Sequence, residues 1–221
     1  MKYKIINSGS DGNATVIEDI ILIDCGVSFQ KLKSYYKKLK IVLLTHIHND
    51  HFNKSTIKKL AAERPTLRFA CCYWLIKDLL DCGVSKKNID VLKIGISYDY
   101  TLFKIIPIKA YHDVPNCGYR IFINNKKIIY ITDTCTLEGI SAKNYDLYLV
   151  EANYDENELK NRINQKLDND EYAYEIRVEK THLSKKQCTE FFIENSMDSS
   201  ILIYMHEHKD KEVKHEDDRN I

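Results

Sequence analysis

Cysteine pairs at metal-binding spacing are missing from this sequence. Its seven cysteines are an odd set with no C-x-x-C pair, which is the spacing of neither a zinc ribbon nor a disulfide framework. They are Cys25, Cys71, Cys72, Cys82, Cys117, Cys135 and Cys188. Reduced thiols in a cytosol are the simpler interpretation.

Long apolar runs are missing as well. No run reaches the roughly 18 apolar residues of a membrane-spanning helix, and the opening MKYKIINSGSDGN holds no apolar stretch of signal-peptide length. We therefore expect no membrane partner and a cytoplasmic location.

An excess of charge of either sign is the third absence. The chain has 33 basic and 32 acidic residues, so its formal net charge is +1 and no global field draws it to nucleic acid or acidic lipid. It also has no Pro-rich linker and no internal repeat. With 221 residues, 44% of them hydrophobic, we expect a single domain over residues 1–206 and a charged tail over residues 207–221.

The order of the expected elements predicts the fold class. Hydrophobic patterning and turn residues predict strands at 2–6, 14–18, 20–24, 41–45, 89–92, 101–108, 118–123, 127–132, 147–151 and 201–205. Helices are expected at 28–39, 53–63, 73–81, 155–164 and 184–195. Along the chain, a mixed region of strands and helices is followed by a region of strands and then by a region of helices. This order indicates an α+β sandwich of two mixed β-sheets flanked by helices.

Four potential metal ligands occur within six residues, directly after the expected strand at 41–45. They are His46, His48, Asp50 and His51, in the segment THIHNDHF. A lone histidine is more often a structural hydrogen-bonding residue, but four such groups on one loop indicate a metal site. Imidazole and carboxylate together suit zinc, manganese or iron, and the absence of thiolates argues against a closed structural zinc site.

The segment His46-Ile47-His48-Asn49-Asp50-His51 matches the His-x-His-x-Asp-His signature of the metallo-β-lactamase superfamily. Three further motifs resemble those of the superfamily in the same order along the chain: His112 in AYHDVPNCGYRI, Asp133 in IIYITDTC and His206 at the end of ILIYMH. The resemblance covers most of the chain. It implies an αββα sandwich and two divalent metal ions, zinc by expectation, with Mn²⁺ or Fe²⁺ as alternatives.

The resemblance also implies which residues hold each metal. One metal would be held by His46, His48 and His112, and the other by Asp50, His51 and His206, with Asp133 between them. His208 lies two residues beyond His206 and stays an alternative for the last ligand. Asp24 resembles an aspartate that closes an early strand of this fold, and we expect it to orient a ligand histidine. The turn at 9–13 resembles the glycine-rich first hairpin of the phosphodiesterase branch.

His182, in Thr181-His182-Leu183-Ser184, distinguishes between branches of the superfamily. By itself the segment could be a helix cap in which Ser184 or Thr181 matters and His182 lies on the surface. Ribonuclease Z-like phosphodiesterases, however, have a histidine followed by a small hydroxyl residue here. The stretch at 151–163 is similar to the small bacterial and phage exonuclease-like members of that branch. The resemblance therefore implies a phosphodiesterase in which a dimetal-bridging hydroxide attacks, Asp50 orients or deprotonates the water and His182 protonates the leaving oxygen or stabilises charge.

The substrate stays open between a nucleotide and a nucleic acid. The chain lacks the long insertion of a tRNA-gripping arm, and its length suits the phage anti-Pycsar phosphodiesterases, which open 3′,5′-cyclic nucleotides and would act in a host cytoplasm. The resemblance also implies a homodimer.

A DNA or RNA exonuclease is the alternative enzyme. A phosphate-tracking helix face with Tyr35 and Tyr36 for base stacking could then be formed by Lys31, Lys33, Lys37, Lys38 and Lys40. A solvated helix surface is the plainer interpretation of that lysine run. A third hypothesis, a non-catalytic binding protein on the hydrolase fold, is disfavoured because every expected ligand type is present.

Overall fold

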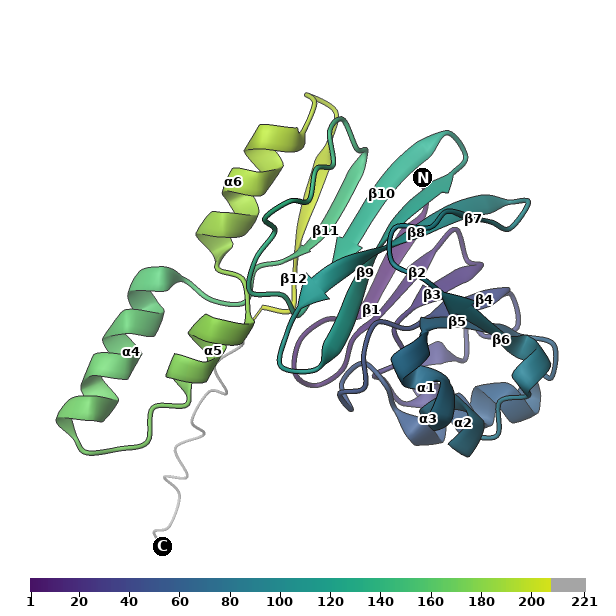
Figure 1. Cartoon of the computed structure of the whole chain (residues 1–221), viewed down its shortest axis with the longest axis horizontal. Helices are drawn as coiled ribbons and strands as arrows, with labels where there is room; N and C mark the ends of the chain where they lie inside the picture. The colour runs from purple at the N-terminus through teal and green to yellow at the C-terminus, as the bar shows by residue number, and fades with distance from the viewer. Residues whose placement is uncertain (208–221) are drawn as a thin grey trace, which may run out of the picture.

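Two six-stranded β-sheets pack against each other in the computed structural model, which describes residues 1–207 (Figure 1). The first sheet has the order β1 (Tyr3–Asn7), β2 (Ala14–Ile17), β3 (Ile21–Ile23), β4 (Ile41–Leu43), β5 (Arg68–Cys72) and β6 (Ile89–Leu92). The second has the order β12 (Ile201–Met205), β11 (Leu147–Glu151), β10 (Lys126–Ile131), β9 (Pro115–Ile123), β8 (Phe103–Tyr111) and β7 (Tyr98–Asp99). The expected tail, apart from Glu207, and His208 lie outside the described residues.

Both sheets are mixed, as the sequence predicts. In the first, β1, β2 and β3 are antiparallel, and β3, β4, β5 and β6 run parallel. In the second, β7, β8, β9 and β10 are antiparallel, and β10, β11 and β12 run parallel. The carboxyl ends of the parallel strands within each sheet therefore meet at one edge, which is where ligands bind in sheets of this kind.

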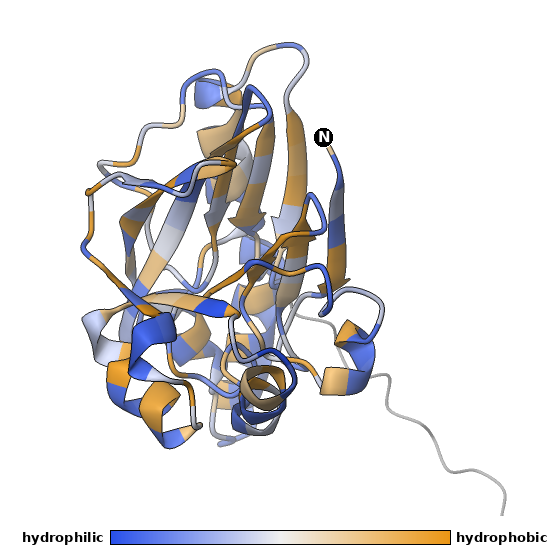
Figure 2. Cartoon of the chain, turned by 90° about the vertical axis from the view of Figure 1, so that its right-hand side faces the viewer, coloured by the Kyte–Doolittle hydropathy of each residue, from blue (hydrophilic) through white to orange (hydrophobic). Residues whose placement is uncertain are grey.

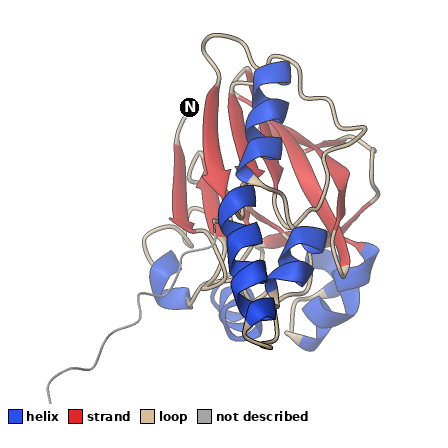
Figure 3. Cartoon of the chain, turned by 90° about the vertical axis from the view of Figure 1, so that its left-hand side faces the viewer, coloured by secondary structure: helices blue, strands red, loops and turns tan. Residues whose placement is uncertain are grey.

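Helices cover the outer faces of the sandwich (Figure 3). The first sheet carries α1 (Phe29–Leu32), α2 (Lys54–Glu63), the 3₁₀ turn η1 (Tyr73–Leu75), α3 (Ile76–Asp81) and the 3₁₀ turn η2 (Lys86–Asn88). The second carries α6 (Lys185–Asn195), while α4 (Glu156–Asp168) and α5 (Glu175–Thr181) form a pair beyond the ends of its strands (Figure 1). None of the helices within residues 1–207 is both long and apolar enough to cross a membrane.

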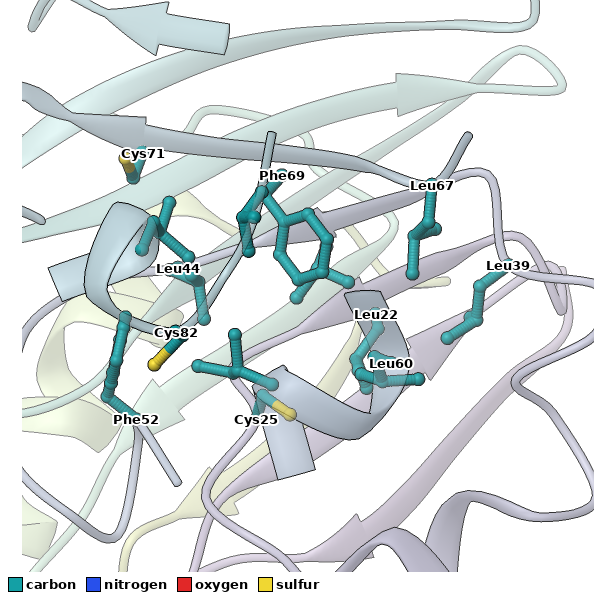
Figure 4. Packing of buried hydrophobic residues seen from close by; sticks show 14 of the residues in the cluster. Leu22, Cys25, Leu39, Leu44, Phe52, Leu60, Leu67, Phe69, Cys71 and Cys82 are labelled. Atoms are coloured by element: carbon teal, nitrogen blue, oxygen red, sulfur yellow. The ribbon is translucent and has the colours of Figure 1, made fainter. Parts of the chain in front are cut away.

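The central strands are apolar at consecutive positions because both of their faces are covered. In β3, Ile21 and Ile23 pack between the sheets, whereas Leu22 packs on the opposite face, under the helices. Leu22 meets Phe69 of β5 and Leu60 of α2 there, as Figure 4 shows. Apolar residues accordingly mark the interior strands in Figure 2. Such strands are recognised by a continuous apolar run and not by alternation.

Three of the elements that differ from expectation do so for a local reason. The helix expected at 28–39 ends at Leu32, and the chain continues in turns that bring Leu39 into the core. The strand β5 was not expected, because its sequence RFACC has no β-branched residue. The helix α5 was not expected either, since its sequence EIRVEKT buries only Glu175 and so has no apolar stripe.

Candidate metal centre

The predicted metal ligands follow the ends of strands and gather at one edge of the sandwich. His46 lies just beyond β4, His112 directly after β8, Asp133 just beyond β10 and His206 directly after β12. Their side chains form overlapping groups, in each of which the ligand atoms lie within 4.8 Å of one another. These groups are His46, His48 and His112; Asp50, His51 and His206; His46, His51 and Asp133; and Asp133, Glu151, His182 and His206. The structure thus brings together all seven predicted ligands.

Three of the histidines are oriented by hydrogen bonds at Nδ1. His46 Nδ1 lies 2.9 Å from Thr45 Oγ1, His51 Nδ1 lies 2.7 Å from Asp24 Oδ2 and His112 Nδ1 lies 2.9 Å from the Thr181 carbonyl oxygen. An acceptor at Nδ1 fixes the ring and leaves Nε2 with its lone pair, as in histidines that bind metals. The contact to His51 is the orienting role expected of Asp24.

His46 Nε2 is the clearest sign that the cluster fits a metal ion. The side chain is fully buried, yet among the described residues Nε2 has no hydrogen-bond partner. Burial lowers the pKa of His46 well below its usual value, so the ring is neutral and its lone pair is available. A buried polar atom without a partner is costly, and a cation at this point would satisfy it. The donor set therefore fits a divalent metal.

The carboxylates of the cluster give it an excess of negative charge. Burial lowers the pKa of His51, but Asp133 and Asp24 raise it well above its usual value. Burial likewise opposes charge on His206, but Asp133, Asp50 and Glu151 raise its pKa to about 10. Protons on His51 and His206 thus offset part of the negative charge of these carboxylates. Bound divalent cations would offset the same charge. Zinc, manganese and iron all accept this mixture of nitrogen and oxygen ligands.

The backbone is strained at three residues of this centre. Asp24, Asp133 and His206 have φ values of 57°, 55° and 55°, in the left-handed region that residues with a side chain rarely occupy. Each residue closes a strand, and the conformation turns its side chain into the centre. Strain of this kind costs on the order of 1–3 kcal/mol per residue and concentrates at functional sites.

The early turn contributes a residue whose role the sequence did not indicate. Asn13 Nδ2 lies 2.7 Å from His51 Nε2 and 3.3 Å from Asp50 Oδ2, so Asn13 contacts two predicted ligands. Its backbone N–H donates to the Asp50 carbonyl oxygen at 2.6 Å. A Cβ on Gly26 would lie 1.6 Å from that same carbonyl oxygen, so only glycine allows this close approach. The turn does approach the site, as the resemblance implies.

His182 lies in the cluster and not on the surface. Its side chain is 16% exposed, and its ring stacks on that of His206 with centroids 5.3 Å apart. Its Nδ1 lies 2.6 Å from Glu151 Oε1, and that carboxylate also accepts from the Thr134 N–H at 2.7 Å. Ser184 caps α6 in a capping box with Gln187, so the helix-cap interpretation holds for Ser184. The sequence signal for Glu151 was an acidic residue closing a buried apolar strand.

Asp113 is a further residue that sequence reasoning missed. Its Oδ1 lies 3.1 Å from His112 Nε2 and 3.4 Å from His48 Nε2, and its Oδ2 accepts from Arg177 of α5. The carboxylate therefore connects the three-histidine group to the outer wall of the site. An acidic residue next to a predicted ligand was the available signal.

An open cleft of about 390 Å³ leads to the cluster. Its walls include the predicted ligands His48, Asp50, His112, Asp133 and His206, together with His182 and residues of the α4–α5 pair: Tyr172, Tyr174, Arg177, Val178 and Thr181. The volume lies within the range of about 300–1,000 Å³ that is typical of small-ligand pockets. A second cavity of about 480 Å³ shares His112 and Thr181 with it.

The lysine run does not form the helix face considered for an exonuclease. Its lysines are exposed, but the α-helix ends at Leu32 and no continuous face presents them. Tyr35 and Tyr36 are half-buried against the core, and Tyr36 packs edge-on against Phe29 with ring centroids 5.0 Å apart.

Comparisons with known proteins agree with this architecture. The chain is similar to the metallo-beta-lactamase fold protein YhfI from Bacillus subtilis (18% identity, TM-score 0.69, covering 94% of this chain and 86% of that one). It is also similar to the short form of human tRNase Z (14%, 0.71, 95% and 93%). A third similar structure is Zn²⁺-bound PqqB from Methylobacterium extorquens (11%, 0.56, 73% and 76%). At these identities the likeness establishes the fold alone.

The family assignment rests on the sequence itself. No curated protein sequence matches the chain. The family model described as "Beta-lactamase superfamily domain" matches residues 20–207, which include every predicted metal ligand and His182. The chain therefore belongs to the beta-lactamase superfamily, and its two mixed sheets flanked by helices are the metallo-β-lactamase fold.

Proposed function

We propose that the protein is a metal-dependent phosphodiesterase. The observation that carries this proposal is the pairing of His182 with Glu151 at 2.6 Å, beside a cluster of seven potential metal ligands. A histidine whose Nδ1 is held by a buried carboxylate can present Nε2 to a substrate as a proton donor. The similarity to a tRNase Z supports the same chemistry, because ribonucleases cleave phosphodiester bonds.

The metal assignment stays as the sequence predicts. We propose that His46, His48 and His112 hold one divalent ion and Asp50, His51 and His206 the other, with Asp133 between them. Bound divalent ions would lower the pKa of a water molecule and neutralise phosphate oxygens. Zinc is the proposed metal, and a similar fold with Zn²⁺ bound supports it.

The chain's own residues then have distinct roles. Asp50 lies at the cleft with Oδ2 3.3 Å from His206 Nε2, where it can accept a proton from the attacking water. His182, on the side of the cluster near His112 and His206, donates a proton to the leaving oxygen. Glu151 positions His182 by accepting at Nδ1.

We propose nucleotides as the substrate class, with 3′,5′-cyclic nucleotides preferred over polymers. The small cleft supports this preference, and the lack of a continuous lysine face removes one argument for an exonuclease. An anti-Pycsar-like role and a homodimer stay predictions from the resemblance.

The test is to incubate the metal-loaded protein with 3′,5′-cyclic mononucleotides and, separately, with short single- and double-stranded DNA and RNA. Opening of cyclic nucleotides at both low and moderate salt supports the preferred substrate, whereas shortening of polymers with a steep salt dependence makes the protein a nuclease. If the protein cleaves neither the cyclic nucleotides nor the polymers, the phosphodiesterase proposal is refuted.

Two variants connect any product to the site. A variant with both His48→Ala and Asp50→Ala should lose metal and activity together. His182→Ala should keep its metal content, measured by mass spectrometry of the metal, and lose about 10²–10⁴-fold in turnover. Unchanged turnover in His182→Ala would show that the proton-donor role is wrong.

A further inference from the structure

The α4–α5 pair places aromatic residues on the wall of the metal cleft. The segment between the two helices carries Tyr172 and Tyr174, and α5 carries Arg177; all three line the cleft that holds Asp50 and Asp133. The pair lies beyond the strand ends and not on a sheet face (Figure 1). These three side chains therefore line the cleft instead of packing in the core between the sheets.

Tyr172 is unusually exposed for an aromatic residue. At 84% exposure it is the most exposed of the large hydrophobic side chains within residues 1–207, and it has no hydrogen bond or ring contact there. A solitary exposed aromatic needs no explanation on an ordinary surface. Beside a charged cluster of predicted metal ligands, however, the exposed Tyr172 ring supplies an apolar surface that the ligands themselves lack.

The neighbouring residues hold this segment in place. Lys166 of α4 contacts Glu175 of α5 at 2.7 Å, and the Glu175 side chain is buried. The same Lys166 ammonium lies 4.2 Å from the centre of the Tyr174 ring, so one face of Tyr174 is already covered. Tyr172 thus projects from a segment whose ends are fixed, with its ring available.

Arg177 adds a positive charge between the ring and the cluster. Its guanidinium pairs with Asp113 Oδ2, while Asp113 Oδ1 lies 3.1 Å from His112 Nε2. The side chain is 68% exposed, so donors remain for a second partner. Arginine binds phosphate oxygens well because its donors match their geometry.

We propose that Tyr172 is the base-stacking residue of this protein and that Arg177 contacts the phosphate of the same ligand. The ligand class is a nucleoside phosphate, with its phosphate at the metal cluster and one face of its base on Tyr172. The inference rests on the proposed phosphodiesterase function and specifies how its substrate is held. Because every base has a stacking face, this contact selects for a base without selecting which one.

Binding of non-hydrolysed ligands tests the inference without relying on catalysis. We would measure the affinity of the metal-loaded protein for adenosine 5′-monophosphate and for ribose 5-phosphate by calorimetry. We expect the nucleotide to bind about 10-fold more tightly, since stacking on one aromatic ring is worth that much or more. Tyr172→Ala should remove the difference, and Tyr172→Phe should keep it.

The matched control is Tyr73→Ala, which removes an exposed tyrosine outside this cleft and should leave the 10-fold difference intact. Arg177→Gln should weaken both ligands by a similar factor, because both carry the phosphate. Equal affinity of the unaltered protein for the two ligands, or a difference that survives Tyr172→Ala, would overturn the stacking role. Unchanged affinities in Arg177→Gln would overturn the phosphate contact.

A hydrolysis experiment separates this inference from the proposed function. The substrates are thymidine 5′-(p-nitrophenyl phosphate) and methyl p-nitrophenyl phosphate, which share a leaving group and differ in the nucleoside. We expect Tyr172→Ala to raise KM about 10-fold for the first substrate alone, with kcat unchanged. If the unaltered protein cleaves neither ester and also leaves the cyclic nucleotides and nucleic acids intact, the phosphodiesterase proposal fails, while the binding measurement still decides the role of Tyr172.

Discussion

The two ring nitrogens of His46 have different surroundings, and this difference indicates that the ring is oriented to bind a ligand. Nδ1 is held by Thr45, whose hydroxyl also donates to Asp24, while Nε2 is buried and has no hydrogen-bond partner within residues 1–207. A ring fixed on one side and unsatisfied on the other is oriented for a ligand that the protein chain does not supply. Asp24 orients His51 in the same manner, so one buried carboxylate holds two neighbouring predicted ligands in place.

At the residue scale, Glu151→Gln tests whether Glu151 positions His182. The amide has nearly the same shape but no charge, so we expect turnover to fall about 10–100-fold with metal content retained. The pH profile of kcat should also change, because a neutral amide would replace the carboxylate that contacts His182 Nδ1. The control is Glu194→Gln, a conservative change in α6 outside the cleft, which should alter neither. A uniform loss with an unchanged pH profile would indicate a merely structural role.

Gly26→Ala tests the close approach of two backbone segments. The added Cβ would lie 1.6 Å from the Asp50 carbonyl oxygen, so the ligand loop must move. We expect a loss of more than about 3 kcal/mol in stability, as for other severe backbone clashes, together with loss of metal. Gly139→Ala is the control: it has open space but a φ of 75°, and should cost about 1 kcal/mol by chemical denaturation. Equal effects of the two changes would contradict the clash.

At the element scale, α6 begins at a side-chain cap that also stabilises the histidine segment before it. Ser184 Oγ accepts from the Gln187 N–H, Gln187 Oε1 accepts from the Ser184 N–H, and Ser184 Oγ donates to Glu156 of α4. His182 lies two residues before this cap and is the residue at which α5 ends. The end of one helix and the start of the next thus fix His182 from both sides.

Ser184→Ala should therefore cost more than an ordinary surface change. Loss of the cap alone is worth about 1 kcal/mol, and the contact to Glu156 adds to it. We expect a decrease of about 1–2 kcal/mol in the free energy of unfolding, measured by denaturant titration. Ser28→Ala offers the comparison, because Ser28 precedes α1 without a side-chain cap. This substitution should lower the free energy of unfolding by only about 0.3 kcal/mol. A cost below about 0.5 kcal/mol for Ser184→Ala would be incompatible with the capping box.

At the scale of the whole molecule, the metal centre joins the two sheets. His46 and His48 follow a strand of the first sheet, whereas Asp133 and His206 follow strands of the second. Divalent ions held by both groups would connect the two halves of the sandwich. Their removal should then affect the stability of the entire fold.

Chelation measures this connection. At a thousand-fold excess of free metal over Kd, binding adds about 4 kcal/mol, which for a chain of this size raises the thermal midpoint by about 8–16 °C. We expect the midpoint to fall by that amount after chelation, verified by loss of metal, and to recover on adding zinc. The variant with both His48→Ala and Asp50→Ala should show no such response. A midpoint unaffected by complete metal removal would rule out a stabilising role.

The sequence by itself determined the type of fold and predicted a metal-binding role for the cluster. Ligands placed on one short loop after an apolar strand, as in His46 to His51, are readable because their spacing alone brings them together. The alternation of strand and helix patterns likewise predicted two mixed sheets, and the cysteines, all within residues 1–207, are unpaired as expected. The assignment of each metal ligand and the substrate remain predictions.

Only the tertiary structure decided how distant residues meet. Asn13, Asp113 and Glu151 lie in separate segments, and no local pattern states that the first contacts His51 or that the last holds His182. The strand β5 was missed because its sequence RFACC has no β-branched residue, and the helix α5 was missed because it buries only Glu175 and so has no apolar stripe. The cleft wall formed by Tyr172 and Arg177 follows from that missed helix, since its position depends on packing between α4 and α5 and not on any motif.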